Sequence, residues 1–402
     1  MVSMRRITAG RTRAWVWFVV QVGLGLAAGL SLIEVTLQLN PGLLWNGMAL
    51  PAPAEPPLTA KDYVVRYSDA DVFYWSADKI RPVAPEADRI EAYVHFETDE
   101  LGFANAAPLP PRADVVVLGR SYSLGAQAAE GWPRQVARQT GWQVVNLSQA
   151  GSGIDLKVQY LRDFGLLRHP RWVIVEVLPA MDILGYEPPA PLLLQGLPFA
   201  LTQRLARQWL GAPAPANPAQ FIYPLAVDLP GRTAHLIFFS QYLSSLTVSR
   251  SAWAGSQDWA AYRQRLLALK QAAQAQGLCV ALLFAPTKEN LYVSLVRDPA
   301  QLEPVQKDLR TWRLAESGRL VPAESGVTDV ASLQANALAA HDLLVEFART
   351  YGLPLVDPTS EMKEAALGGQ DPFMAYDTHW SALGHQIVAQ AVASTLRNAS
   401  CP

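Results

Sequence analysis

The 402-residue sequence predicts an α/β fold, in which helices cover both faces of a central parallel sheet, preceded by one N-terminal transmembrane helix. Short apolar runs alternate with helical patterns along most of the chain, which is typical of strands buried on both faces. Near the N-terminus, one uncharged stretch is long enough to cross a bilayer. Half of the residues are hydrophobic and 17% are charged, so the chain can bury a substantial core.

The N-terminal stretch has the features of a membrane anchor. Residues 14–33 carry no charge, four arginines precede them, and Glu34 is the first charge after them. About twenty residues at 1.5 Å each span roughly 30 Å, the thickness of the hydrocarbon core. A cleaved signal peptide is the alternative, but the apolar run is longer than a signal core. We therefore expect residues 1–39 to be a cytoplasmic N-terminus and a single-pass anchor in the inner or cytoplasmic membrane, with the rest of the chain periplasmic or extracellular.

Proline-rich residues follow the expected anchor. The sequence PAPAEPP at residues 51–57 favours an extended spacer, so residues 40–61 are expected to link the anchor to a domain over residues 62–402. Within that domain, residues 187–256 are rich in proline and apolar side chains and break the alternation of strands and helices. We interpret them as an insertion over the edge or mouth of the sheet.

The alternating elements can be placed along the chain. Strands are expected at residues 114–118, 143–147, 172–178, 279–286 and 353–356, and helices at residues 131–140, 155–167, 259–276, 331–351 and 381–397. The strand runs are short and apolar, and the first three are rich in β-branched residues. Strand and helix alternate in the order that a parallel sheet requires.

A serine and an Asp-x-His motif carry the candidate chemistry. Ser121 follows the first predicted strand directly, at the edge where open α/β sheets bind ligands. A serine hydroxyl is a weak nucleophile unless a base takes its proton and a carboxylate orients that base. Asp377 and His379 supply both groups just before the last predicted helix. Each motif alone is common, but their order and context together predict a triad of Ser121, His379 and Asp377.

These motifs resemble those of the SGNH, or GDSL-type, hydrolases over residues 98–397. Gly119-Arg120-Ser121 corresponds to the family's Gly-Asp-Ser block, residues 146–153 to its glycine loop, and the Asp-x-His motif to its last block. The motif Asp-x-His-Trp-Ser is similar to that of the membrane-anchored, alginate O-acetyltransferase-like group. In that group the Asp-His block precedes the serine block, whereas here it comes last, so the resemblance is to the broader SGNH class.

The resemblance implies a three-layer, flavodoxin-like SGNH domain with the activity of a serine esterase or O-acyltransferase. Its substrate would be an ester-linked acyl group, acetyl above all, on a cell-surface or exported glycan, or on an acylated small molecule. The backbone N–H groups of Ser121 and Gly151 would be the oxyanion donors. Such chemistry requires no cofactor and no metal. A membrane protein that donates acyl groups is a further expected partner.

The sequence departs from the family pattern in two places. Arg120 stands where the family has aspartate, and residues 178–182 lack the asparagine of the third block. Loss of one oxyanion donor typically lowers the rate by about 10² to 10³. Two functions therefore remain open: an active enzyme, and a catalytically inactive protein that binds a glycan or helps to assemble an export complex.

Three further residues are candidate substrate contacts, and each has a structural alternative. Arg120 could hold an anionic group such as a uronate carboxylate, or could be a solvated or salt-bridged residue beside the crevice. Lys288 follows the strand at residues 279–286 and could contact substrate or be an ordinary surface lysine. Trp380 could form the floor of a sugar-binding surface or belong to the core. Ser123 and His385 are expected to be a satisfied hydroxyl and a packing or surface residue.

Charge and cysteine content exclude other classes of protein. A net charge of −2 and a pI near 6.3 give no basic field for nucleic acid. Cys279 and Cys401 match no metal-ligand spacing, and we expect Cys279 to be a core residue and the pair to form no disulfide framework. The six histidines include no zinc-binding pair.

Overall fold

The computed structural model describes most of the predicted α/β domain. The described residues are 61–66, 90–96, 98–126, 128–184, 186, 222–296, 312–322, 330–375 and 377–401, with Gln21, Val22, Gly25 and Gly29 near the N-terminus. The chain divides into two compact units, residues 1–53 with 189–217 and residues 54–188 with 218–402, and the candidate site lies in the second. Apart from those four positions and residue 61, the expected anchor and linker fall outside the described residues. Within the described ranges, no helix is long and apolar enough to cross a membrane.

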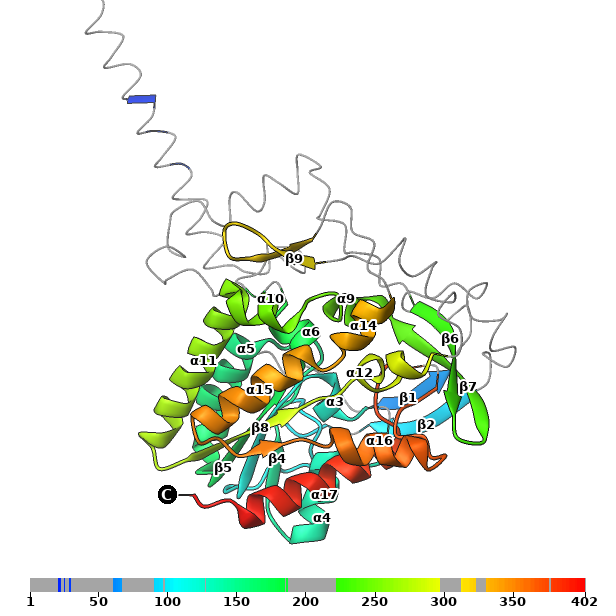
Figure 1. Cartoon of the computed structure of the whole chain (residues 1–402). Coiled ribbons are helices and arrows are strands. Elements are labelled where there is room, and N and C mark those ends of the chain that lie inside the picture. Colours follow the sequence, from blue (N-terminus) through cyan, green and yellow to red (C-terminus); the bar gives the residue numbers. More distant parts are fainter. Residues whose placement is uncertain are drawn as a thin grey trace, which may run out of the picture. The chain divides into compact units, whose positions relative to one another are not determined.

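A five-stranded parallel sheet forms the centre of the domain. It consists of β3 (Val115–Leu118), β4 (Val144–Asn146), β5 (Trp172–Val177), β8 (Cys279–Phe284) and β11 (Leu355–Val356), in the order β11-β8-β5-β3-β4. Figure 1 labels three of these strands, β4, β5 and β8. Counted along the chain, this is the 2-1-3-4-5 order of flavodoxin-like sheets. The predicted α/β fold with a central parallel sheet is confirmed.

The strand order places a topological switch point where the candidate site should lie. The chain passes from β3 to its neighbour β4 on one side, and then from β4 back across β3 to β5 on the other side. A topological switch point therefore lies between β3 and β5. Val116 pairs with Val145 on one side and with Val173 on the other, so the carboxyl ends of the three strands reach the same edge. The loops after β3, β4 and β5 therefore meet there.

Alternating side chains bury the sheet on both faces. Val115 and Val117 join one core with the helices α4 (Trp132–Thr140) and α17 (Ala382–Asn398). Val116 and Leu118 join the other core with α5 (Ile154–Tyr160), α11 (Gln257–Gln274) and α15 (Ala339–Thr350). Burial on two faces explains why the strand at Val115–Leu118 is apolar at every position.

Most predicted helices are present, with differences at their ends. The expected helix over residues 331–351 is two helices, α14 (Val330–Ala335) and α15. The helix expected to reach residue 167 changes after α5 into a π-turn at Leu161–Gly165 and a 3-10 turn. Outside the insertion, the sequence pattern did not reveal α6 (Pro179–Asp182), α12 (Lys288–Tyr292) and α16 (Thr359–Leu367). The first two are five residues or shorter, too short to show a period. A further short helix, α3 (Ser121–Leu124), follows β3.

Residues 222–256 of the predicted insertion form a hairpin and two short helices. These are β6 (Ile222–Leu229), β7 (Arg232–Phe239), α9 (Ser240–Ser245) and α10 (Arg250–Gly255). Residues 187–221 lie outside the described residues. The backbone N–H of Ile237 on β7 donates to the carbonyl of Ala375 at 2.9 Å. The insertion thus contacts the segment that leads to Asp377. Elsewhere, β1 (Lys61–Arg66) pairs antiparallel with β2 (Ile90–Phe96), and β9 (Trp312–Leu314) forms a hairpin with β10 (Leu320–Pro322).

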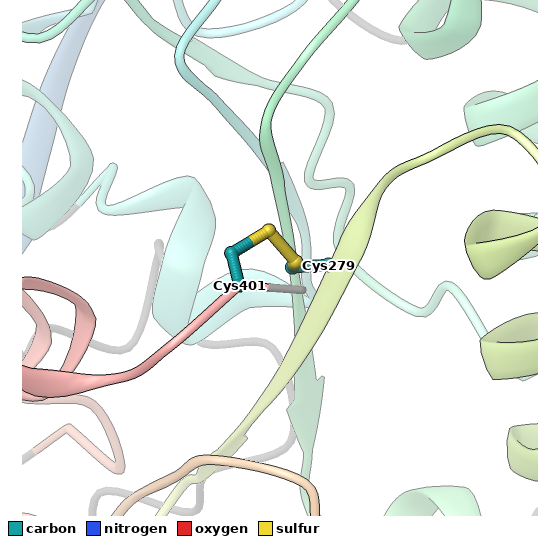
Figure 2. Close-up of a disulfide and its surroundings, with 2 residues drawn as sticks. All are labelled: Cys279 and Cys401. Atoms are coloured by element: carbon teal, nitrogen blue, oxygen red, sulfur yellow. A yellow bond between two sulfur atoms is a disulfide. The ribbon is translucent and has the colours of Figure 1, made fainter.

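A disulfide joins Cys279 to Cys401 (Figure 2), so the expectation that the two cysteines form no disulfide framework is wrong, although Cys279 does belong to the core as expected. The two Cα atoms lie 5.7 Å apart although 122 positions separate the residues. Cys279 is the first residue of β8, and Cys401 follows α17. Because α17 begins beside the candidate site and packs along the sheet, it returns the chain to the opposite edge, where β8 starts. The pairing depends on this tertiary path and not on a local spacing.

Candidate active site

Ser121 lies at the carboxyl end of β3, as the first residue of the short helix α3. Its side chain is partly exposed, whereas Tyr122 and Ser123 are buried. A Cβ atom on Gly119 would lie 2.3 Å from Ser123 Cβ and 2.7 Å from Ser148 Oγ, so only glycine fits before this turn. Close packing beneath the turn therefore fixes the backbone that presents Ser121.

Asp377 and His379 form the expected pair. Nδ1 of His379 lies 2.5 Å from Oδ1 of Asp377, which also accepts the backbone N–H of His379 at 2.8 Å. Burial would raise the pKa of Asp377, but the charge and hydrogen bonds of His379 outweigh it and hold the pKa below its usual value. Nε2 of His379 is buried and has no hydrogen-bond partner among the described residues. The pair thus leaves free the nitrogen that a general base uses.

Tyr122 connects the serine turn to the Asp-x-His segment. Its hydroxyl donates to the carbonyl of Thr378 at 2.7 Å, across 256 positions of sequence. Its ring lies 5.0 Å from the His379 ring, measured between centroids. The residue next to Ser121 therefore touches both Thr378 and His379. Within the described part of the chain, no hydrogen bond joins Ser121 Oγ to His379 Nε2.

The glycine loop after β4 is held against the serine turn. The carbonyl of Gly119 accepts the N–H of Gln149 at 3.1 Å and the hydroxyl of Ser152 at 2.7 Å. Gly151, between these two residues, is exposed and has a φ of +82°, a conformation that favours glycine. The described residues offer its N–H no hydrogen-bond acceptor. This placement suits the predicted oxyanion donor, which remains a prediction.

Arg120 is buried in an ion pair beneath the serine turn. Its side chain is 7% exposed, and Nη1 lies 2.8 Å from Oδ1 of Asp182 and 3.1 Å from the carbonyl of Met181. Asp182 also binds Lys157 Nζ, at 3.1 Å. Burial would raise the pKa of Asp182, but the two cations outweigh it and hold the pKa below its usual value. Of the two interpretations of Arg120, the geometry favours the salt-bridged residue over a contact to a substrate carboxylate.

Glu176 completes this buried charge cluster. It lies on β5 with no exposed surface, and its Oε2 accepts the backbone N–H of Ser123 at 2.9 Å. Burial raises the pKa of Glu176, and its Oε1 has no partner among the described residues. Lys157 donates to the Glu176 carbonyl at 2.7 Å. The sequence analysis did not single out Glu176 or Lys157, although a glutamate inside the apolar run Trp172–Val177 was a signal.

The structure does not support substrate contacts by Lys288 and Trp380, because neither side chain has exposed surface. Lys288 Nζ donates to the carbonyls of Met374 at 2.6 Å and Ala375 at 2.9 Å. Trp380 Nε1 donates to the carbonyl of Pro286 at 3.0 Å. Trp380 belongs to the core, which was the structural alternative for this residue. Lys288 is buried in the interior, so it is neither a substrate contact nor a surface lysine.

Ser123 and His385 are structural residues. Ser123 Oγ accepts Trp132 Nε1 at 3.2 Å, and His385 Nδ1 accepts the Trp132 backbone N–H at 3.4 Å. Burial lowers the pKa of His385 to about 3, so this ring is neutral. Among the residues described, no group of three or more His, Cys, Asp or Glu side chains could hold a metal ion.

Residues 318–402 match a family model described as the SGNH hydrolase-like domain of the acetyltransferase AlgX. This segment carries Asp377, His379 and α17. The resemblance to the SGNH hydrolases is confirmed. The match supports, in general terms, a domain that transfers acyl groups or hydrolyses esters. No protein of curated function matches the sequence.

Several solved structures of SGNH-type and esterase proteins are similar over most of the chain. An acetyl xylan esterase, AlAXEase, is 11% identical with a TM-score of 0.35, covering 70% of this chain and 98% of its own. A catalytic mutant of the acetylxylan esterase Axe2 from Geobacillus stearothermophilus is 13% identical with a TM-score of 0.34, covering 71% and 94%. A GDSL-like lipase from Bacteroides thetaiotaomicron is 11% identical with a TM-score of 0.32, covering 71% and 88%. Structural similarity at this level gives no information about the roles of individual residues in this site.

Proposed function

We propose that the protein is an extracytoplasmic serine esterase or O-acyltransferase acting on ester-linked acyl groups, acetyl above all, of a cell-surface or exported glycan. The observation that carries the proposal is the Asp377–His379 pair: its Nε2 has no partner among the described residues, and the His379 ring lies 5.0 Å from that of Tyr122 in the serine turn. Both lie at the carboxyl edge of the sheet, where a doubly wound fold binds its ligand. The match to an acetyltransferase-type domain supports the choice of acyl chemistry.

The geometry supports a two-step reaction through an acyl-serine. His379 Nε2 takes the proton of Ser121 as Oγ bonds to the ester carbonyl carbon, and Asp377 stabilises the imidazolium. The N–H groups of Ser121 and Gly151 stabilise the carbonyl oxygen as it becomes negative. The C–O bond then breaks, and His379 returns the proton to the departing sugar hydroxyl. Water or an acceptor hydroxyl, deprotonated by His379, attacks the acyl-serine and restores Ser121.

The Cys279–Cys401 disulfide supports the extracytoplasmic location, since structural disulfides persist in oxidising compartments and are rare in the cytosol. The expected anchor at residues 14–33 would hold the domain at the membrane with its site outside. Its partners there would be a glycan and, for transfer, a membrane protein that supplies the acyl group.

Acetate release tests the proposal directly. The full-length protein in detergent is incubated with an aryl acetate and with acetylated polysaccharide, with and without a deacetylated acceptor glycan. We expect acetate release or transfer that Ser121→Ala abolishes and that Ser123→Ala, two positions further along the same helix, retains in part. Wild-type protein that neither releases nor transfers acetyl groups would refute the enzyme.

A non-catalytic glycan-binding or export-complex assembly role is the second candidate. Two observations favour it: Arg120 replaces the usual aspartate, and no hydrogen bond joins Ser121 Oγ to His379 Nε2 among the described residues. In that case acetylated glycan would bind equally to the wild type and to Ser121→Ala, and neither protein would release acetate. The same set of incubations separates the two functions.

A further inference from the structure

The segment that carries Asp377 and His379 has almost no regular secondary structure. Between α16 and α17, the described residues contain only an isolated bridge between Phe373 and Trp380. Two backbone hydrogen bonds close this loop, from Met374 N–H to the His379 carbonyl and from Ser381 N–H to the Pro372 carbonyl, both at 3.0 Å. The position of the imidazole therefore depends on contacts from other elements.

Lys288 makes two of these contacts, in addition to the bonds from the Tyr122 hydroxyl to the Thr378 carbonyl and from the Ile237 N–H to the Ala375 carbonyl. It is the first residue of α12, directly after β8, and a capping box between Thr287 and Asn290 fixes the backbone there. Its Nζ donates to two consecutive carbonyls, of Met374 and Ala375, across 86 and 87 positions of sequence. These carbonyls precede Asp377 by three and two residues. One buried side chain thus ties the end of a central strand to the loop.

Complete burial of an ammonium group requires compensation. Lys288 has no exposed surface, and transfer of a cation from water to the interior costs several kcal/mol unless hydrogen bonds and opposite charges offset it. Two carbonyl oxygens and the carboxylate of Asp377 supply the offset. Burial would raise the pKa of Asp377, but His379 and the Lys288 charge outweigh it and lower the pKa. Lysine is almost never fully buried unless it is paired, so these contacts account for the place of Lys288 in the interior.

The same turn also holds the other side of His379. The carbonyl of Pro286, two residues before Lys288, accepts Trp380 Nε1 at 3.0 Å. The turn between β8 and α12 therefore contacts the loop before Asp377 and directly after His379. Contacts on both sides of the Asp377–His379 segment restrict the position and the orientation of the imidazole.

We propose that Lys288 is a positioning residue of the active site, which holds the Asp377–His379 segment at the distance from Ser121 that proton transfer needs. The inference deepens the proposed function and rests on it for its catalytic consequence. Lys288 touches neither substrate nor the reacting atoms, so its removal should affect the turnover step and leave substrate binding nearly unchanged.

The test compares Lys288→Met with Lys270→Met in the full-length protein. Lys270 is a matched control, because its Nζ also donates to a loop carbonyl, that of Tyr351 at 2.6 Å, but on α11 away from the site. For an aryl acetate, we expect Lys288→Met to lower kcat about 10- to 100-fold with KM unchanged within about threefold. Lys270→Met should match the wild type, and Lys288→Arg should recover part of kcat.

The pH dependence of unfolding adds a further readout. Without the Lys288 charge, the pKa of Asp377 rises, so as the pH falls Lys288→Met should lose stability at a higher pH than the wild type does. His379 and Lys288 are the charged groups that face Asp377, and only Lys288 is changed. A raised KM with unchanged kcat would instead make Lys288 a binding residue and overturn the proposal.

Amide hydrogen exchange makes the inference independent of activity. In Lys288→Met the N–H groups of Met374 and Ser381 should exchange faster, and in Lys270→Met they should not. If the wild type releases no acetate, the proposed function fails while the exchange result still decides whether Lys288 holds the loop. If Lys288→Met does not fold, Lys288→Gln, which keeps one donor but no charge, takes its place. Unchanged exchange and unchanged kcat in a folded variant would overturn the proposal.

Discussion

Replacement of Arg120 by methionine should destabilise the protein strongly, even though Arg120 departs from the family pattern. The substitution keeps an unbranched side chain but removes the cation that lies 2.8 Å from Asp182. Asp182 has no exposed side-chain surface, so water cannot replace the lost partner. Removing one member of a buried ion pair typically costs about 3 to 5 kcal/mol. Because Lys157 Nζ and the Leu178 N–H still bind Asp182, at 3.1 and 2.9 Å, we expect the lower limit, about 3 kcal/mol.

Urea unfolding measures this cost. With a denaturant slope of about 2 to 3 kcal/mol per M, a loss of about 3 kcal/mol moves the midpoint down by about 1 to 1.5 M. Arg250→Met is the matched control, since Arg250 pairs with Glu346 at 2.6 Å but both side chains are about half exposed. An exposed pair contributes less than about 1 kcal/mol, so the control midpoint should shift little. Equal shifts in the two variants would refute the interpretation of Arg120 as a buried structural cation.

The same variant separates structural from substrate-binding roles. A buried Arg120 should affect uronate-containing and neutral acetyl esters by the same factor, because it meets neither substrate directly. Asp182→Asn should be more destabilising than Arg120→Met, since it removes the carboxylate that Arg120 and Lys157 share. A selective loss of activity on the acidic substrate would show that the guanidinium reaches substrate after all.

Two further predictions concern other parts of the fold. The double variant Cys279→Ala/Cys401→Ala should lower the free energy of unfolding by about 2 to 4 kcal/mol, because the disulfide closes a loop of 122 residues in the unfolded chain. Reduction of the disulfide in the unfolded wild type should lower the free energy of unfolding by the same amount. No loss of stability in either case would contradict a native disulfide. His341 binds Asp357 at 2.7 Å and Asp342 at 2.9 Å, and although burial opposes it, these carboxylates raise the pKa of His341. The stabilisation that His341 contributes is therefore complete below its pKa in the unfolded chain, about 6.5, and is lost as the pH rises through its pKa in the folded protein. His341→Asn should accordingly destabilise the protein more at about pH 5.5 than at about pH 9. A difference from the wild type that does not change with pH would contradict the ion pair.

Local patterns in the sequence predicted the sheet and the candidate catalytic groups. Strands such as Val115–Leu118 and Cys279–Phe284 are recognisable because burial on both faces makes every position apolar. Asp377 and His379 are recognisable because the two groups lie two residues apart. Ser121 follows its strand directly. In each case, the residues that define the feature are neighbours in the chain.

Contacts between distant segments were not predictable in this way. Arg120 meets Asp182 across 62 positions and Lys288 meets Met374 across 86, and no periodicity marks either pair. The disulfide depends on where α17 ends relative to β8, which only the tertiary path fixes. Burial also reverses expectations for long polar side chains, as for Lys288, which the sequence alone assigns to the surface by default.

Covalent labelling of Ser121 is the most direct test of the central claim, that His379 and Asp377 activate this serine. The full-length protein is treated with a fluorophosphonate probe, and the modified residue is identified by mass spectrometry. We expect one adduct, on Ser121, which is absent in Ser121→Ala and forms far more slowly in His379→Ala and Asp377→Asn. An unlabelled wild type, or labelling that persists in Ser121→Ala, would contradict the account.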